Sequence, residues 1–307
     1  MNHQRWLLTD ISREMMTYLF QEAKPPPDER KMRLLVAACC RLVWDRYEKK
    51  CVVCGGDKRY FVTAATSGSL SEWNVCHVCH GSGNYRWLRR HVELAEDFAD
   101  GRAEVVQLAK AHVQGQACWT THPEANMIAM ARYVTLPNAT HAAARVARDG
   151  LIDGPPDGAV ANAIREIIGD PFSPPANPVL PTRYCRQCGA PMTMTANHLH
   201  QLGLWHCVRH RKHNTEAVTV EEMRLHKERS KCVWLTPTTI GLARSIYDSR
   251  TFERMPFLAD ALEEAGCADN ALLEHCRGVA PLPGLIYLRE PTHFRGCWAL
   301  DSILNNC

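Results

Sequence analysis

Residues 28–49 read DERKMRLLVAACCRLVWDRYEK, and this stretch decides the fold. Asp28 follows three prolines, where its side chain can cap the first turn of a helix. The apolar residues that follow recur at helical spacing: Met32, Leu35, Val36, Cys39, Cys40, Val43 and Tyr47. Residues at these intervals form one continuous stripe along a helix. The stretch therefore predicts a helix over 28–49 that packs one face against a core.

The same kind of pattern recurs along most of the chain. Residues 157–168 carry Asp157 as a cap and end at Gly169, where a glycine often terminates a helix. Another helix is predicted to begin at Thr236, with Pro237 in its first turn. Further helices are predicted at about 91–100, 103–113, 124–134, 139–148, 256–265, 270–276 and 296–304. The sequence therefore predicts a mainly α fold, a helical body.

Two segments, 51–84 and 183–215, depart from this pattern. They hold paired cysteines, many turn residues and short β-leaning runs at Tyr60–Thr63, Glu72–Val75 and Gly203–His206. Five prolines in Asp170–Pro181 indicate an extended linker. The expected organisation is a helical body with two small β-containing zinc-ribbon or knuckle insertions. Its parts are an N-terminal helical part (1–50 and 85–170), insertion 1 (51–84), a linker (171–182), insertion 2 (183–215) and a C-terminal helical part (216–307).

Composition narrows the class of protein. The 307 residues are 46% hydrophobic and 22% charged, which is typical of a folded globular chain. No apolar run approaches the roughly 18 residues of a membrane span, and the N-terminus lacks the pattern of a secretory signal. We therefore expect a cytoplasmic protein with no membrane partner. Fifteen cysteines in a reducing compartment, several of them paired at short spacing, favour metal binding over disulfides.

The first cysteine cluster comprises Cys51, Cys54, Cys76 and Cys79, two CxxC pairs separated by 21 residues. A CxxC turn supplies two thiolates from one tight loop, and zinc favours four such ligands in a tetrahedron. Glycines follow each pair, and residues 60–75 can form a hairpin between the pairs. This spacing predicts a closed, structural zinc site.

The second cluster comprises Cys185, Cys188, Cys207 and His210, in a CxxC…CxxH arrangement. His210 is the preferred fourth ligand because it keeps the two-residue gap, and the alternatives are His206, His213 and Cys232. Four protein ligands would close this site as well. Two structural zinc ions per chain are expected, and no small-molecule substrate is evident.

Two other functions remain open. Basic residues in 86–91 and 209–231, together with Trp87 or Trp205, suggest nucleic-acid binding. A net charge of +3 instead favours a solvated charged helix at about 216–230, with the tryptophans in small cores. A thiol or zinc enzyme would use Cys207, His210 or a cysteine outside the clusters. Eight cysteines lie outside the clusters: Cys39, Cys40, Cys118, Cys232, Cys267, Cys276, Cys297 and Cys307. Core packing is the favoured role for them, because the sequence shows no base partner.

Four stretches resemble known families. CHVCHGSG, Cys76–Gly83, resembles the CxxCxGxG knuckle of DnaJ-type chaperones, whereas Cys51–Gly56 keeps only its first part because Lys58 replaces the last glycine. Arg30–Glu48 resembles the RKLRLFACACCR segment of a helical bacterial family expanded in planctomycetes. Trp234–Gly278 and His293–Leu304 resemble that family's IYDERAFDRLPILADALEEAGC and HVRGCWVVDLLL segments.

In that family the corresponding helical segments follow one another almost directly in the sequence. In this chain the two cysteine clusters lie between those segments. The resemblance therefore implies two insertions into a helical body, and the family supplies no activity to carry over. The favoured interpretation is a non-enzymatic, zinc-binding helical scaffold or adaptor whose partner is most plausibly another protein. The alternatives stay nucleic-acid binding and, less favoured, a thiol- or zinc-dependent enzyme.

Overall fold

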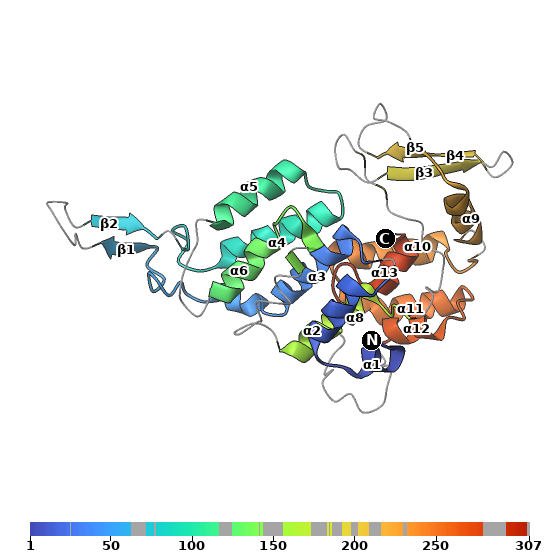
Figure 1. The fold of residues 1–307 in the computed structure, drawn as a ribbon, viewed down its shortest axis with the longest axis horizontal. Coiled ribbons are helices and arrows are strands. Elements are labelled where there is room, and N and C mark those ends of the chain that lie inside the picture. The colour runs from blue at the N-terminus through green and yellow to red at the C-terminus, as the bar shows by residue number, and fades with distance from the viewer. Residues whose placement is uncertain are drawn as a thin grey trace.

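A computed structural model gives the arrangement of the chain. The described residues are 1–24, 26–62, 72–76, 78–116, 125–140, 142–143, 156–172, 183, 185, 192–197, 202–208, 216–229, 232–278 and 293–305. The fold is mainly helical, as the sequence predicts, and the described strands form two small sheets. One sheet projects from the helical body at one end, and the other lies beside helix α9 (Figure 1). Among the described residues, no helix is both long and apolar enough to cross a membrane.

The helices of the first half surround one hydrophobic core, named here the N-terminal core. They are α1 (His3–Leu8), α2 (Ser12–Gln21), α3 (Glu29–Arg41), α4 (Arg86–Ala99), α5 (Val105–Gln116), α6 (Ala125–Tyr133) and α8 (Asp157–Ile168). Helix α3 lies among the others and contacts α4, α6 and α8. The helix predicted at 139–148 is helical at 139–140 and 142–143, and its remainder lies outside the described residues.

Helix α3 begins as predicted but ends earlier. The Asp28 side chain accepts a hydrogen bond from the Lys31 backbone N–H at 2.7 Å, and every residue from Arg30 to Cys40 is buried. The prediction of one helix to residue 49 was wrong: α3 ends at Arg41 and a 3₁₀ turn, Trp44–Glu48, follows. Val43 leaves the helical backbone (φ −118°, ψ 26°), which redirects the chain toward the first cysteine pair while Val43 and Tyr47 stay buried.

The helices of the second half surround a separate hydrophobic core, the C-terminal core. They are α10 (Pro237–Ser249), α11 (Met255–Glu264), α12 (Asn270–Cys276) and α13 (Trp298–Leu304), with a 3₁₀ turn at Phe252–Arg254. Thr236 caps α10 in a reciprocal capping box with Thr239, which explains why this start can be read from the sequence. The predicted glycine terminator of α8 is also confirmed, since Gly169 has φ +79°.

A buried ionic network joins the two cores. Asp301 of α13 is fully buried and accepts hydrogen bonds from Arg30 Nη1 at 2.8 Å and Nη2 at 3.0 Å. Lys31 Nζ lies 2.6 Å from the same carboxylate. Arg30 also contacts Tyr247 of α10 and Asp100, which accepts a hydrogen bond from the Tyr247 hydroxyl at 2.8 Å. Charged side chains such as Arg30 and Lys31 usually face solvent on an amphipathic helix, but here they are buried. Their contacts join α3 to α10 and α13.

The sheets account for the β-leaning runs of the sequence. Strands β1 (Arg59–Val62) and β2 (Glu72–Val75) form an antiparallel ribbon, named here the ribbon, close to the two predicted runs. Strand β4 (Leu202–Cys207) contains the third predicted run. It lies between β3 (Met192–Asn197) and β5 (Glu216–Ala217), two strands that the sequence pattern did not predict. Helix α9 (Val220–Arg229) follows, where a charged helix was expected at about 216–230.

Candidate metal centre

The two CxxC turns lie side by side at the base of the ribbon. The Cys51 backbone N–H donates to the Gly83 carbonyl at 2.8 Å, and the Cys76 N–H donates to the Lys58 carbonyl at 2.9 Å. An isolated bridge between Lys50 and Asn84 closes the entry and exit of the segment. The backbone alone therefore brings the two cysteine pairs, which are far apart in the sequence, to one place.

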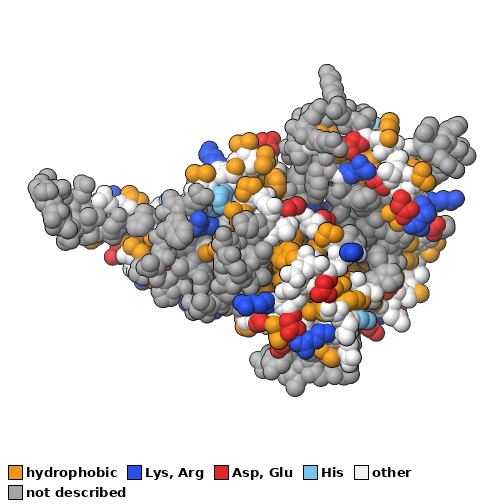
Figure 2. Space-filling model, in the orientation of Figure 1, with side chains coloured by type: hydrophobic (Ala, Val, Ile, Leu, Met, Phe, Trp, Pro, Cys, Tyr) orange, Lys and Arg blue, Asp and Glu red, His pale blue; other side chains and the backbone are white. Residues whose placement is uncertain are grey.

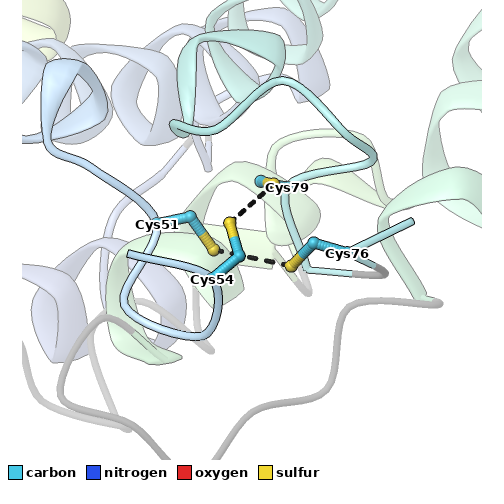
Figure 3. A group of neighbouring side chains, drawn as sticks. All are labelled: Cys51, Cys54, Cys76 and Cys79. Atoms are coloured by element: carbon cyan, nitrogen blue, oxygen red, sulfur yellow. Dashed lines mark hydrogen bonds between the residues drawn. The ribbon is translucent and has the colours of Figure 1, made fainter. Parts of the chain in front are cut away.

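The four cysteine sulfurs converge on one point (Figure 3). The Sγ atoms of Cys51 and Cys76 are 3.8 Å apart, and those of Cys54 and Cys79 are 3.7 Å apart. All four sulfurs lie within 4.8 Å of one another and all four residues are buried. A zinc ion bound to four thiolates at about 2.3 Å separates the sulfurs by about 3.8 Å, whereas a disulfide needs about 2.05 Å. The cluster can therefore hold a tetrahedral metal ion.

The two knuckles, residues 51–58 and 76–83, repeat the same backbone conformation. In each, the first, second and fourth residues after the second cysteine have positive φ. These residues are Gly55 (+60°), Gly56 (+101°) and Lys58 (+68°) in one knuckle and His80 (+50°), Gly81 (+74°) and Gly83 (+81°) in the other. The knuckle likeness therefore extends through Lys58 in conformation, although glycine is missing there.

Alanine substitutions at Gly83 and Gly55 distinguish two effects of adding a side chain to a knuckle, which are backbone strain and steric overlap. Both residues have positive φ, so alanine should cost about 1 kcal/mol of backbone strain at either position. At Gly83 a Cβ would also lie 2.6 Å from the Gly56 carbonyl oxygen, whereas Gly55 has open space. We expect Gly83→Ala to cost roughly 2–3 kcal/mol and Gly55→Ala about 1 kcal/mol, measured as lost metal affinity in competition with a chelator. Equal losses would contradict the close packing of the knuckles.

Backbone amides and burial act in opposite directions on the thiols. Burial raises the pKa of Cys76 to about 12 and also raises the pKa of Cys51. Burial acts the same way on Cys54, but hydrogen bonds from the Gly56 backbone, the Cys79 side chain and the Lys58 backbone together outweigh it and lower the pKa of Cys54. The Gly83 N–H also donates to Cys79 Sγ at 3.3 Å. Thiolates are the metal-binding form of cysteine, so these amide donors suit the sulfurs of a metal site.

Half of the second predicted cluster falls within the described residues. Cys185 and Cys207 are both buried and belong to one small hydrophobic group with Met192 and Trp205. Cys188 and His210, like the alternative His213, lie outside the described residues. The structure therefore brings two of the four predicted ligands into one group, and a zinc ion at this cluster stays a prediction.

Two alternatives for the fourth ligand of this cluster lose support. His206 precedes Cys207 on strand β4, so their side chains point to opposite faces, and His206 Nε2 lies 2.9 Å from the Thr195 hydroxyl. Cys232 packs against the C-terminal core, whereas Cys185 and Cys207 do not belong to that core. His210 therefore remains the preferred fourth ligand.

The residues proposed to bind nucleic acid are largely engaged within the protein. Arg86 and Arg89 both pair with Glu48, and Trp87 packs edge-on against His80 and His91. Trp205 is buried, as the small-core interpretation expected. Within 209–231, of which 216–229 is described, two arginines are bound: Arg224 pairs with Glu221, and Arg229 donates to the carbonyls of Ser302 and Ile303.

Core packing is confirmed for several of the cysteines outside the clusters. Cys39, Cys40, Cys267 and Cys276 are buried within the two hydrophobic cores, while Cys118 and Cys307 lie outside the described residues. Cys297 differs, because its sulfur lies 3.2 Å from His275 Nε2.

Sequence reasoning missed a second convergent cluster. Glu166, His275, His293 and Cys297 each place one ligand atom within 4.8 Å of the others. Three of these residues lie within 23 positions, 275–297, but their spacing is not one that is typical of a metal site. The fourth ligand, Glu166, comes from a distant helix, and only the fold brings it there.

Comparison of the chain with protein-family models, with curated proteins and with solved structures returned no match. The case for a metal ion at either cluster therefore rests on the side chains themselves and their geometry.

Proposed function

We propose that the chain is a non-enzymatic helical scaffold in which a structural zinc ion holds the ribbon in place for binding another protein. The observation that supports it best is the set of four buried sulfurs at tetrahedral spacing. Four protein thiolates fill the coordination shell of zinc and leave no position for a substrate or an activated water. The metal would then contribute folding free energy rather than chemistry.

Zinc is the metal that this donor set favours. Thiolates are soft ligands, and tetrahedral four-sulfur sites in proteins hold zinc or iron. The two CxxC turns with glycines behind them are typical of zinc ribbons and knuckles. A second structural zinc ion at Cys185, Cys188, Cys207 and His210 is part of the same proposal. The proposal also includes the division of the chain at 51–84 and 183–215. It includes, in addition, the relationship to the planctomycete-expanded helical family.

The ribbon suggests a protein partner because it exposes apolar side chains. Trp73 and Val75 lie two residues apart on β2, so they share one face, and they are 60% and 59% exposed. Val52 in the first knuckle is 43% exposed. Hydrophobic side chains are visible at the base of the projecting ribbon (Figure 2). Exposed aromatic and branched residues that lie close together are characteristic of protein-binding surfaces.

The double substitution Trp73→Ser with Val75→Ser tests this function. Neither residue is a metal ligand, so we expect the variant to keep its zinc and its helix content while it loses capture of the protein that the wild-type chain retains from its source lysate. Substitution of Val113, which is 66% exposed on α5, by serine is the matched control and should keep that partner.

Two results would count against a protein-binding scaffold. One is a captured protein set that does not change in the double variant. The other is salt-dependent retardation of nucleic acid by the wild-type chain, which would instead favour the nucleic-acid interpretation.

A further inference from the structure

A second convergent cluster of metal-binding side chains lies where the N-terminal and C-terminal cores meet. Glu166 belongs to α8 and His275 to α12, while His293 and Cys297 lie just before α13. Helix α13 contacts both α8 and α12. The four side chains therefore come from three segments that the fold packs together, and none of them belongs to the knuckles.

The distances within this cluster suit a tetrahedral metal ion. His275 Nε2 lies 3.2 Å from Cys297 Sγ and 3.4 Å from Glu166 Oε2. Around zinc, a nitrogen and a sulfur ligand are separated by about 3.6 Å and a nitrogen and an oxygen ligand by about 3.4 Å. His293 Nδ1 lies 2.9 Å from the other carboxylate oxygen, Glu166 Oε1, so the carboxylate would have to turn one oxygen toward the ion to complete a four-ligand site.

Two pairwise hydrogen bonds, His293 with Glu166 and His275 with Cys297, leave one short contact of the cluster unexplained. Nε2 of His275 faces both a carboxylate oxygen and a sulfur, although a single ring nitrogen can donate only one proton. Glu166 in turn lies against two imidazoles. Four potential ligand atoms within 4.8 Å of one another are an arrangement that one bound cation can use in full.

A cysteine nucleophile with His275 as its base fits less well. Cys297 is completely buried, whereas a reactive thiol needs access for its substrate. The nucleophile would also leave His293 without a role. A metal ion uses all four side chains, and one carboxylate, two imidazoles and one thiolate form an ordinary zinc ligand set.

The backbone beside two of these ligands is held in place by α3. Lys31 Nζ donates to the carbonyl of Ile167, next to Glu166, at 2.9 Å and to the carbonyl of Gly296, next to Cys297, at 3.0 Å. Gly296 has φ +86°, and a Cβ there would lie 2.8 Å from Leu34 Cδ1. Residues adjacent to the ligands are therefore fixed before any ion binds, as in sites that bind metal with well-oriented ligands.

The cluster lies nearest to solvent at His275. The His275 side chain is 19% exposed and that of Glu166 is 10% exposed, while Cys297 is fully buried. Trp298 packs against the His275 ring, with the ring centres 4.8 Å apart, and covers part of the cluster. His275 is therefore the most exposed of the four ligands.

We propose that Glu166, His275, His293 and Cys297 bind one zinc ion that fastens α8 of the N-terminal core to α12 and α13 of the C-terminal core. This site is independent of the knuckle centre and of the proposed partner. Its role is structural: it crosslinks two halves of the chain that the sequence places more than 100 residues apart.

The test is zinc content, measured on the full-length protein after desalting. We expect His275→Gln to lower the metal content by one zinc ion per chain relative to wild type. The matched control is Glu274→Gln, which removes an exposed carboxylate from the neighbouring position of α12 and should retain all the metal. His275→Cys restores a fourth donor, so it should recover the lost ion, which a hydrogen-bonded cluster would not explain.

A second measurement needs no variant. Removal of zinc from the wild-type protein by a chelator should speed amide hydrogen exchange in α12 and α13, and added zinc should restore the protection. Full zinc content in a folded His275→Gln protein would overturn the proposal, as would exchange in α12 and α13 that does not respond to metal. A knuckle variant that loses its own zinc should keep this one, so the two sites can fail separately.

Discussion

Replacement of Cys76 by serine is expected to remove one zinc ion per chain and to unfold residues 51–83 while the helical body stays folded. Cys76 is fully buried and lies in the cluster of four sulfurs. Apart from the four cysteines, the described residues of the knuckles contribute Val78 to the buried hydrophobic residues, so we expect the metal to be their main source of stability. In small zinc modules, zinc binding contributes on the order of 10 kcal/mol to the free energy of folding.

Three measurements check this result. Zinc content should fall by one ion, helical circular dichroism should change little, and limited proteolysis should cut within 51–83. The control is Cys39→Ala, which removes an equally buried thiol from α3 and should keep the metal. A Cys76→Ser protein with full zinc content would rule out the knuckle centre.

Cobalt substitution examines whether the knuckle site is closed. A cobalt ion bound by four thiolates should show the absorption of a tetrahedral sulfur site, and added azide or imidazole should leave that absorption unchanged. A change on adding either ligand would show an open coordination position, which would favour a catalytic role instead.

Local signals explain why much of the helical fold could be predicted. Helix α12 has the predicted bounds, 270–276, and α10 begins at the predicted cap, Thr236. The knuckle ligands could also be predicted, because each pair of cysteines is encoded by one short turn. In such places the interactions that determine structure lie within a few residues of one another.

The position of α3 in the molecule could not be predicted in the same way. Its apolar stripe suggests an amphipathic helix, yet Arg30, Lys31 and Arg33 are buried too. Arg33 donates to the carbonyls of Val134, Leu136 and Pro137, about 100 residues away. Partners at such separations leave no periodic trace in the sequence, so a charged residue reads as a solvent-facing one.

The cluster at Glu166 could not be predicted for the same reason, because its residues come from distant parts of the sequence. His275, His293 and Cys297 are close in sequence but irregularly spaced, and each has an ordinary role in a helical core. Glu166 joins them only because α8 packs against α13. A ligand set divided between two halves of a chain becomes recognisable only when the tertiary packing is known.

Replacement of Asp301 by asparagine is expected to destabilise the whole protein by about 3–5 kcal/mol. The carboxylate is fully buried and faces both Arg30 and Lys31. The asparagine side chain has nearly the same size, but it removes the carboxylate that the two buried cations share, while Arg30 keeps its ion pair with Asp100. Because the network joins the two hydrophobic cores, we expect both halves to unfold at lower denaturant concentration in a urea titration.

The pKa of Asp301 predicts how the free energy of unfolding depends on pH. Burial alone would raise the pKa of Asp301, but Arg30 and Lys31 outweigh burial and lower the pKa below its usual range. In the unfolded chain an aspartate has a pKa of about 3.9. The stabilisation is therefore fully present above about pH 4 and is lost as the pH falls toward the lower folded-state pKa. Asp301→Asn should lack this part of the acid dependence.

Asp260→Asn is the matched control, because it makes the same chemical change at the surface. The Asp260 side chain is 64% exposed and pairs with Arg277 at 3.3 Å, a contact that water and salt screen. We expect it to cost less than about 1 kcal/mol. Equal midpoints for Asp301→Asn and Asp260→Asn would mean that the buried network contributes no more than a surface pair. Loss of the acid response only in Asp301→Asn would instead identify this carboxylate as the group that joins the two cores.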